Sequence, residues 1–166
     1  MHMEADTNVN IISRDSQPYA RIHHRGPYNE IGECFQRLLT WATSQGLLSE
    51  ETRYFSLSWD DPTAVPVQEL RSAACITIED AGITPPDDIE IATLPSLRWA
   101  VYTLAGPYEG ITDAYQRISD TWLPQQGEAV ADHPCMERYL NDVGTTPPDQ
   151  LRTELCIPLA DRANSG

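Results

Sequence analysis

The chain contains no lysine, and its basic side chains are 11 arginines against 25 aspartates and glutamates, which gives a net charge of −14. A protein that binds nucleic acid directly needs a cationic surface to meet the phosphate backbone, and this composition argues against such a surface. The acidic balance suits a cationic or basic ligand, a basic partner surface, or plain solubility.

Long hydrophobic runs are missing as well. No apolar stretch approaches the roughly 20 residues that a membrane-spanning helix needs. The first residues, Met-His-Met-Glu-Ala-Asp, lack the basic and apolar regions of a secretory signal. We therefore expect no membrane association and a cytoplasmic location. A length of 166 residues and a hydrophobic content of 40% suit a single domain, residues 1–166, with a real core.

Motifs of catalysis and cofactor binding are scarce too. The sequence has no GxSxG, no GxxxxGK and no GxGxxG, and its four cysteines include no CxxC pair. His133, Cys135 and Glu137 would line one face of a strand, but this is a weak metal pattern with no evident fourth ligand. The sequence thus predicts no metal ion and no cofactor.

What the sequence does have is an internal repeat. Gly26-Pro27-Tyr28 recurs 80 residues later as Gly106-Pro107-Tyr108, and further along the offset becomes 81, where Leu70-Arg71 matches Leu151-Arg152. So many matches with a single one-residue slip make chance similarity improbable. The repeat predicts one copy at about 9–79 and a second at about 89–159, joined by a linker rich in proline and acidic residues.

Each copy has the pattern of a βαββ unit, so the sequence predicts an α+β fold with antiparallel sheets. In the second copy we expect the helix to end at Pro124. The predicted strands are 9–14, 18–24, 54–59, 70–78, 89–93, 97–104, 134–140 and 151–159, and the predicted helices are 28–44 and 108–122. Two such units, related by an approximate twofold axis, would leave a groove between them, which is a usual place for a ligand.

Residues that break the repeat are candidates for function. At the offset of 81, Glu137 corresponds to Ser56, Tyr139 to Ser58 and Cys135 to Tyr54. Because strand side chains alternate, Cys135, Glu137 and Tyr139 share one face. We expect the alternate set that includes Phe55 and Leu57 to face the helix, which leaves the Glu137 face for the groove.

A single half-buried glutamate among aromatic rings favours a cationic or hydrogen-bond-donating ligand. The simpler alternatives are that Glu137 pairs with Arg138 or another cation, or faces water, and that each ring is ordinary core packing. The predicted ligand-binding residues are Glu137, Tyr139, Trp99, Tyr19, Ser56 and Tyr54.

These motifs resemble one known family. The resemblance is carried by Gly-Pro-Tyr at the helix start, Thr121-Trp122-Leu123-Pro124 at the predicted end of the second helix, Glu137-Arg138-Tyr139, and the segment Leu151–Pro158. It covers about residues 9–159 and is to the DNA gyrase inhibitor-like (GyrI-like) small-molecule-binding family. The same domain is the effector-binding part of some AraC-type and MerR-type multidrug-responsive activators. The resemblance implies a pseudo-twofold tandem pair of SH2-like βαββ modules, with a ligand-binding glutamate that falls on Glu137.

The resemblance leaves two functions open. The first is a drug- or toxin-binding protein that protects against DNA-directed toxins, with DNA gyrase as a partner in some family members. The second is a hydrolase of cyclopropane-containing DNA-alkylating compounds, in which Glu137 would be catalytic and would activate water. A third reading, independent of the resemblance, is an adaptor whose acidic surface mimics DNA. Because the repeat takes up nearly all of the given sequence, we do not expect a helix-turn-helix domain, and a direct role as a transcription factor is not favoured.

Overall fold

The structure, a computed structural model, describes residues 9–61, 64–106, 110–141 and 146–160. The chain forms two compact units, one made of Asp15–Ser96 and the other of the segment that ends at Arg14 together with the chain from Leu97 onward. Among the described helices, none is both long and apolar enough to cross a lipid bilayer.

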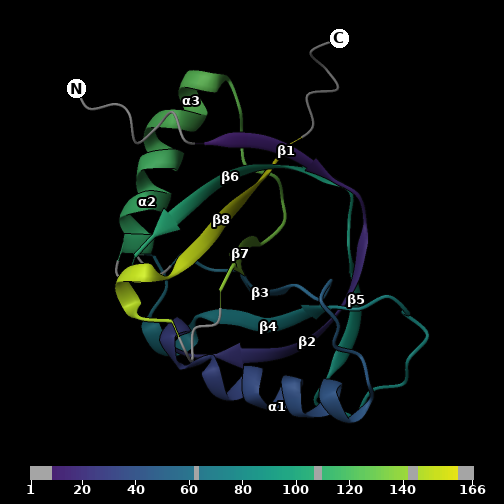
Figure 1. Ribbon diagram of the computed structural model, residues 1–166. Coiled ribbons are helices and arrows are strands. Elements are labelled where there is room, and N and C mark those ends of the chain that lie inside the picture. The colour runs from purple at the N-terminus through teal and green to yellow at the C-terminus, as the bar shows by residue number, and fades with distance from the viewer. Residues whose placement is uncertain (1–8, 62–63, 107–109, 142–145, 161–166) are drawn as a thin grey trace. The chain divides into compact units, whose positions relative to one another are not determined.

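In the Asp15–Ser96 unit, an antiparallel sheet carries one helix. The strands are β2 (Gln17–Arg25), β3 (Tyr54–Ser58), β4 (Arg71–Thr77) and β5 (Glu90–Leu94), paired in the order β5-β2-β4-β3. Helix α1 (Gly32–Ser44) lies along this sheet (Figure 1) and buries Leu38, Trp41 and Ala42 against it. Short 3₁₀ turns cover Tyr28–Glu30 and Val67–Glu69.

The other unit has the same plan. Its strands are β1 (Asn10–Arg14), β6 (Leu97–Ala105), β7 (Cys135–Tyr139) and β8 (Arg152–Leu159), paired antiparallel in the order β1-β6-β8-β7. The helical segment is α2 (Ile111–Arg117), a π-helical stretch (Ile118–Trp122) and α3 (Leu123–Gln126). Ile118, Trp122 and Leu123 pack against Ile157 and Leu159 of β8.

The α+β class and the antiparallel strands are therefore confirmed. Corresponding strands of the two sequence copies occupy corresponding places in the two sheets, with one exchange. The first strand of each copy pairs with the other copy. Strand β1 of the first copy pairs with β6 of the second copy, and β5 of the second copy pairs with β2 of the first copy.

The predicted end of the second helix was wrong. Pro124 lies in the first turn of α3, and the helix ends instead at Gly127, which adopts a left-handed φ of 67°. The π-helical stretch directly before α3 changes the hydrogen-bond pattern at this point, so a proline ring without an N–H is tolerated there. The first helix also differs from the prediction, because Tyr28–Glu30 forms a 3₁₀ turn before α1 begins.

Replacing glycine by alanine should have opposite effects on the free energy of unfolding at two positions near α1. Gly46, just after α1, has a φ of 67°, whereas Gly32 opens α1 without a positive φ, and a methyl group on either would meet no atom within 4 Å. Gly46→Ala should therefore lower the free energy of unfolding by about 1 kcal/mol through backbone strain alone. Gly32→Ala should raise it by about 0.5 kcal/mol. Urea unfolding of both variants checks this, and equal signs would contradict it.

Candidate functional site

Glu137 lies on the face of its sheet that the helical segment covers. Cys135, two residues earlier on β7, packs against the cluster formed by Ile118, Trp122 and their neighbours. Alternation along the strand places Glu137 and Tyr139 on that same face. Across β8, Glu137 pairs with Leu155 and Tyr139 with Thr153.

The predicted assignment of faces was wrong. In the other unit, Tyr54 packs against the cluster that includes Leu38 and Trp41 of α1. Phe55 lies on the opposite face, with its ring centroid 5.4 Å from that of Tyr19. The sequence could not decide between the faces, because both faces of β3 carry apolar or small side chains that can be buried.

The carboxylate of Glu137 sits among protein atoms that remove most of its water. Burial raises the pKa of Glu137 to about 7, and a hydrogen bond with Tyr139 opposes part of that rise. The residue as a whole is half-buried, while its carboxylate group is enclosed. Near neutral pH the group is divided between its ionised and protonated forms.

Tyr115 of α2 faces the same cluster. Its hydroxyl donates a hydrogen bond to the carbonyl of Met136 at 3.4 Å. Burial raises the pKa of Tyr115 far above its usual value, and the acidic groups of Glu137, Cys135, Cys156 and Tyr139 raise it further when they are ionised. Tyr115 is therefore a neutral donor beside Glu137. From the sequence, Tyr115 was predicted only as a core residue, because it follows the helical spacing of the apolar residues on the buried face of the second helix.

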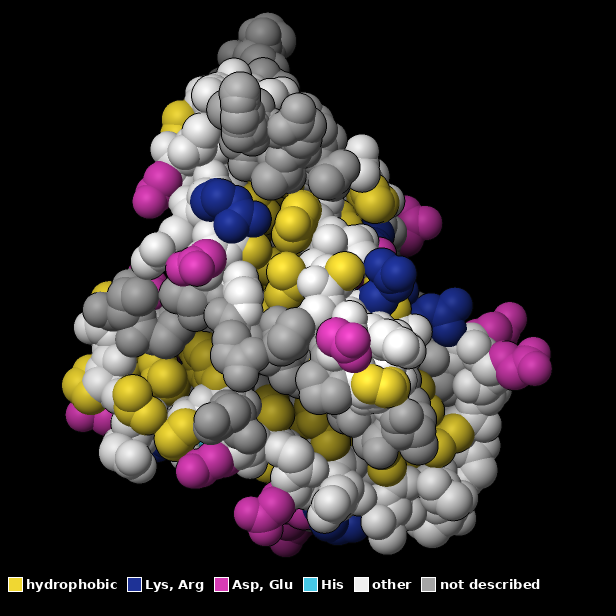
Figure 2. All heavy atoms as spheres, turned by 60° about the vertical axis from the view of Figure 1, so that its left-hand side comes forward, with side chains coloured by type: hydrophobic (Ala, Val, Ile, Leu, Met, Phe, Trp, Pro, Cys, Tyr) yellow, Lys and Arg dark blue, Asp and Glu magenta, His cyan; other side chains and the backbone are white. Residues whose placement is uncertain are grey.

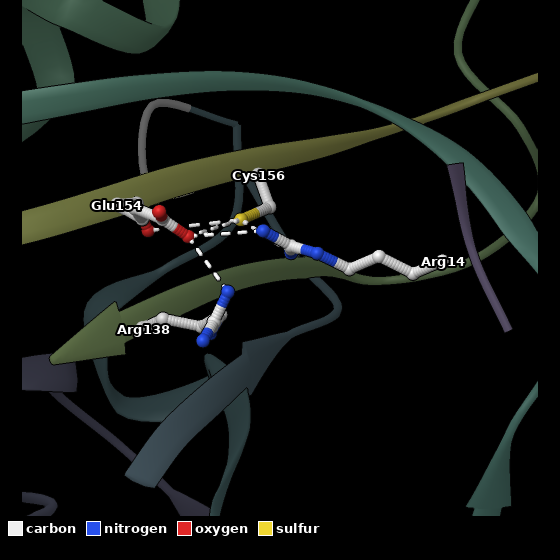
Figure 3. A network of polar contacts seen from close by, with 4 residues as sticks. All are labelled: Arg14, Arg138, Glu154 and Cys156. Carbon is white, nitrogen blue, oxygen red and sulfur yellow. Dashed lines mark hydrogen bonds and ion pairs between the residues drawn. The ribbon is translucent and has the colours of Figure 1, made fainter. Parts of the chain in front are cut away.

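Arg138 does not neutralise Glu137, because adjacent strand residues point to opposite faces. Figure 3 shows Arg138 and Arg14 converging on Glu154 of β8, with N–O distances of 3.0 and 3.1 Å to the same carboxylate oxygen. Arg14 also lies 3.4 Å from the sulfur of Cys156. Among the ion pairs of the described residues, none includes Glu137.

Trp99 does not share the face of Glu137. It pairs with Pro158, and the register of β6, β8 and β7 puts Trp99, Pro158 and Met136 on the opposite face of that sheet. The indole is 1% exposed, and the ring of His133 meets it edge-on at 5.5 Å between centroids. Core packing accounts for these contacts of Trp99.

The remaining predicted ligand residues belong to the Asp15–Ser96 unit. Tyr54 and Ser56 lie on β3, and Ser56 is buried. Tyr19 of β2 is also buried; its hydroxyl accepts a hydrogen bond of 2.8 Å from Arg21, and burial raises its pKa to about 12. The Arg21 guanidinium lies 5.7 Å from the centroid of the Tyr19 ring, so this ring already meets an internal cation.

Other kinds of site receive little support. Among the described residues, no group of three His, Cys, Asp or Glu side chains is arranged to hold a metal ion. On the face shown in Figure 2, acidic side chains are scattered rather than gathered into a strip, which does not favour a DNA-mimicking surface there.

Comparisons with known proteins agree on one family. A model described as the GyrI-like small molecule binding domain matches residues 7–160. The probable transcriptional regulator YgiV of Escherichia coli K12 is 25% identical over 154 residues, covering 92% of this chain and 96% of YgiV. A DNA gyrase inhibitor of Pectobacterium carotovorum is 32% identical over 141 residues, covering 81% of this chain and 88% of the inhibitor.

A solved structure supports the fold. The crystal structure of the EcmrR C-terminal domain superposes with a TM-score of 0.80 at 15% identity, covering 92% of this chain and 97% of that domain. At this identity the likeness concerns the fold alone.

Proposed function

Since the chain belongs to the GyrI-like small-molecule-binding family, we propose that it binds aromatic, often cationic drugs or toxins through Glu137. Capture of such compounds would protect DNA and the enzymes that act on it. The names of its relatives also support DNA gyrase as a proposed partner. We further propose that the two units are SH2-like modules related by the internal repeat, which their matching strand orders support.

The proposal rests on the buried carboxylate of Glu137, which has no cationic partner among the described ion pairs. A buried carboxylate normally has a cationic partner or several hydrogen bonds, because removing its water is costly. Glu137 instead has Tyr139 as a hydrogen-bond partner and Tyr115 close by. A ligand cation would supply the missing charge, and each aromatic ring that it meets would add about 0.5–2 kcal/mol.

The test uses tetraphenylphosphonium, a cation surrounded by four phenyl rings. Isothermal titration calorimetry at pH 8 should give an affinity that Glu137→Gln lowers by about thirtyfold, since a carboxylate about 7 Å from a cation contributes about 2 kcal/mol. Glu33→Gln is the matched control, because Glu33 is an exposed glutamate in the first turn of α1. Equal affinities of the two variants would refute the proposed role of Glu137.

A second candidate function is hydrolysis, which the pKa of Glu137 near 7 favours, because a general base works best when its pKa lies near the operating pH. Glu137 would take a proton from water as the water oxygen bonds to a cyclopropane carbon. The ring carbon–carbon bond would break, and the proton would end on the released carbon. Incubation with a cyclopropane-containing alkylator followed by mass spectrometry separates the candidates. A hydrated product that Glu137→Gln abolishes supports the hydrolase, whereas unchanged compound retained by the protein supports the binder.

A further inference from the structure

Thr153 has a buried hydroxyl group without a hydrogen-bond partner. Within the described part of the chain, this is true of two side-chain atoms, Oγ1 of Thr153 and Oγ of Ser72, and each residue is 1% exposed. The two residues are equivalent in the repeat, at the offset of 81. Native proteins rarely leave buried hydroxyls unpaired, so each such group requires an explanation.

The position of Thr153 next to Glu137 and Tyr139 offers an explanation for its unpaired hydroxyl group. Thr153 lies directly across from Tyr139, and it is two residues from Leu155, which lies across from Glu137. Thr153 and Glu137 are therefore diagonal neighbours on the same sheet face, where such pairs lie about 7–8 Å apart. A polar atom thus lies unpaired beside a carboxylate that lacks a cation.

Ser72 has no comparable neighbours. Ser72 of β4 lies across from Ser58 of β3 and from His24 of β2, and the residue equivalent to Glu137 is Ser56. The same unpaired hydroxyl therefore occurs once beside a carboxylate and once beside Ser58 and His24, where the position equivalent to Glu137 carries no carboxylate. This difference makes Ser72 an internal control for Thr153.

We propose that the Thr153 hydroxyl is a specificity contact for the ligand, hydrogen-bonded to a polar substituent while Glu137 meets the charged or hydrogen-bond-donating group. The inference rests on the proposed binding function and adds the ligand class. That class is an aromatic cation with a hydroxyl, amine or carbonyl group about 7 Å from the group that meets Glu137. A hydroxyl can donate and accept, so Thr153 selects for the presence of a polar group more than for its kind.

The experiment compares two probes that differ by one hydroxyl group, tetraphenylphosphonium and (hydroxyphenyl)triphenylphosphonium. Wild-type protein should bind the hydroxylated probe about fivefold more tightly, the usual net effect of one hydrogen bond. Thr153→Val should remove this preference and leave the affinity for tetraphenylphosphonium unchanged. Thr153→Ser, which keeps the hydroxyl, and Ser72→Ala, which removes the equivalent one, should both keep the preference.

The outcomes separate this inference from the proposed function. A preference that survives in Thr153→Val overturns the inference, whereas tetraphenylphosphonium binding that is insensitive to Glu137→Gln overturns the proposed function. A wild-type protein that binds neither probe overturns both.

The melting temperature gives a second readout, because removal of an unpaired hydroxyl breaks no internal hydrogen bond. Thr153→Val should melt no lower than wild type, and a markedly lower melting temperature or failure to fold would show that the hydroxyl serves the fold instead.

Discussion

Glu137→Gln is expected to raise the free energy of unfolding by about 3 kcal/mol at pH 8 and to leave it nearly unchanged at pH 4. In the folded protein the pKa of Glu137 is about 7, raised by burial from a usual value of 4.5. Below pH 4.5 the group is protonated in both the folded and unfolded states. Between these values the folded state alone keeps the proton, so wild type loses stability as the pH rises through about 7.

The size of the effect follows from the same two pKa values. A difference between about 7 and 4.5, at about 1.4 kcal/mol per pH unit, corresponds to about 3 kcal/mol. Glutamine has nearly the same shape, carries no charge at any pH, and its amide oxygen can still accept the hydrogen bond from Tyr139.

Urea unfolding at pH 4, 6 and 8 measures this difference. The gap between Glu137→Gln and wild type should open with pH, while the control Glu33→Gln should stay close to wild type throughout, because Glu33 is exposed. A gap that stays constant from pH 4 to pH 8 would mean that the carboxylate of Glu137 is not held in its protonated form by burial.

Much of the fold could be predicted from the sequence, because strands and repeats leave local signals. The alternation of apolar residues and the matching turns placed β1 to β8 close to their observed bounds. The exchange of β1 and β5 could not be predicted in this way. The neighbour with which an edge strand pairs is decided by contacts between residues far apart in the sequence. The residues of the strand itself are compatible with either partner, so they do not reveal it.

The candidate site was predicted in part. Period-two alternation joined Glu137 and Tyr139, and the structure gives them a hydrogen bond. The same rule could not show which face the helix covers, so Trp99 was grouped with a carboxylate that lies on the other face of the sheet. Thr153 could not be found from the sequence at all, because an unpaired buried hydroxyl is recognised only from coordinates.

The residues that break the repeat were the most useful signal. Both copies must form the same sheet, so their core positions stay alike, whereas Glu137 replaces Ser56 at a position where a carboxylate is costly. Such a cost without a cationic partner among the described ion pairs points to a role in binding or chemistry, which is the basis of the proposed function.

The most direct test is the affinity for tetraphenylphosphonium as a function of pH. If the ionised carboxylate of Glu137 binds the cation, wild-type affinity should rise by about twentyfold from pH 5 to pH 8, with its steepest change near pH 7. Glu137→Gln should bind weakly and equally at every pH, and should match wild type at pH 5. A wild-type affinity that does not change with pH, or two curves that rise in parallel, would contradict the account.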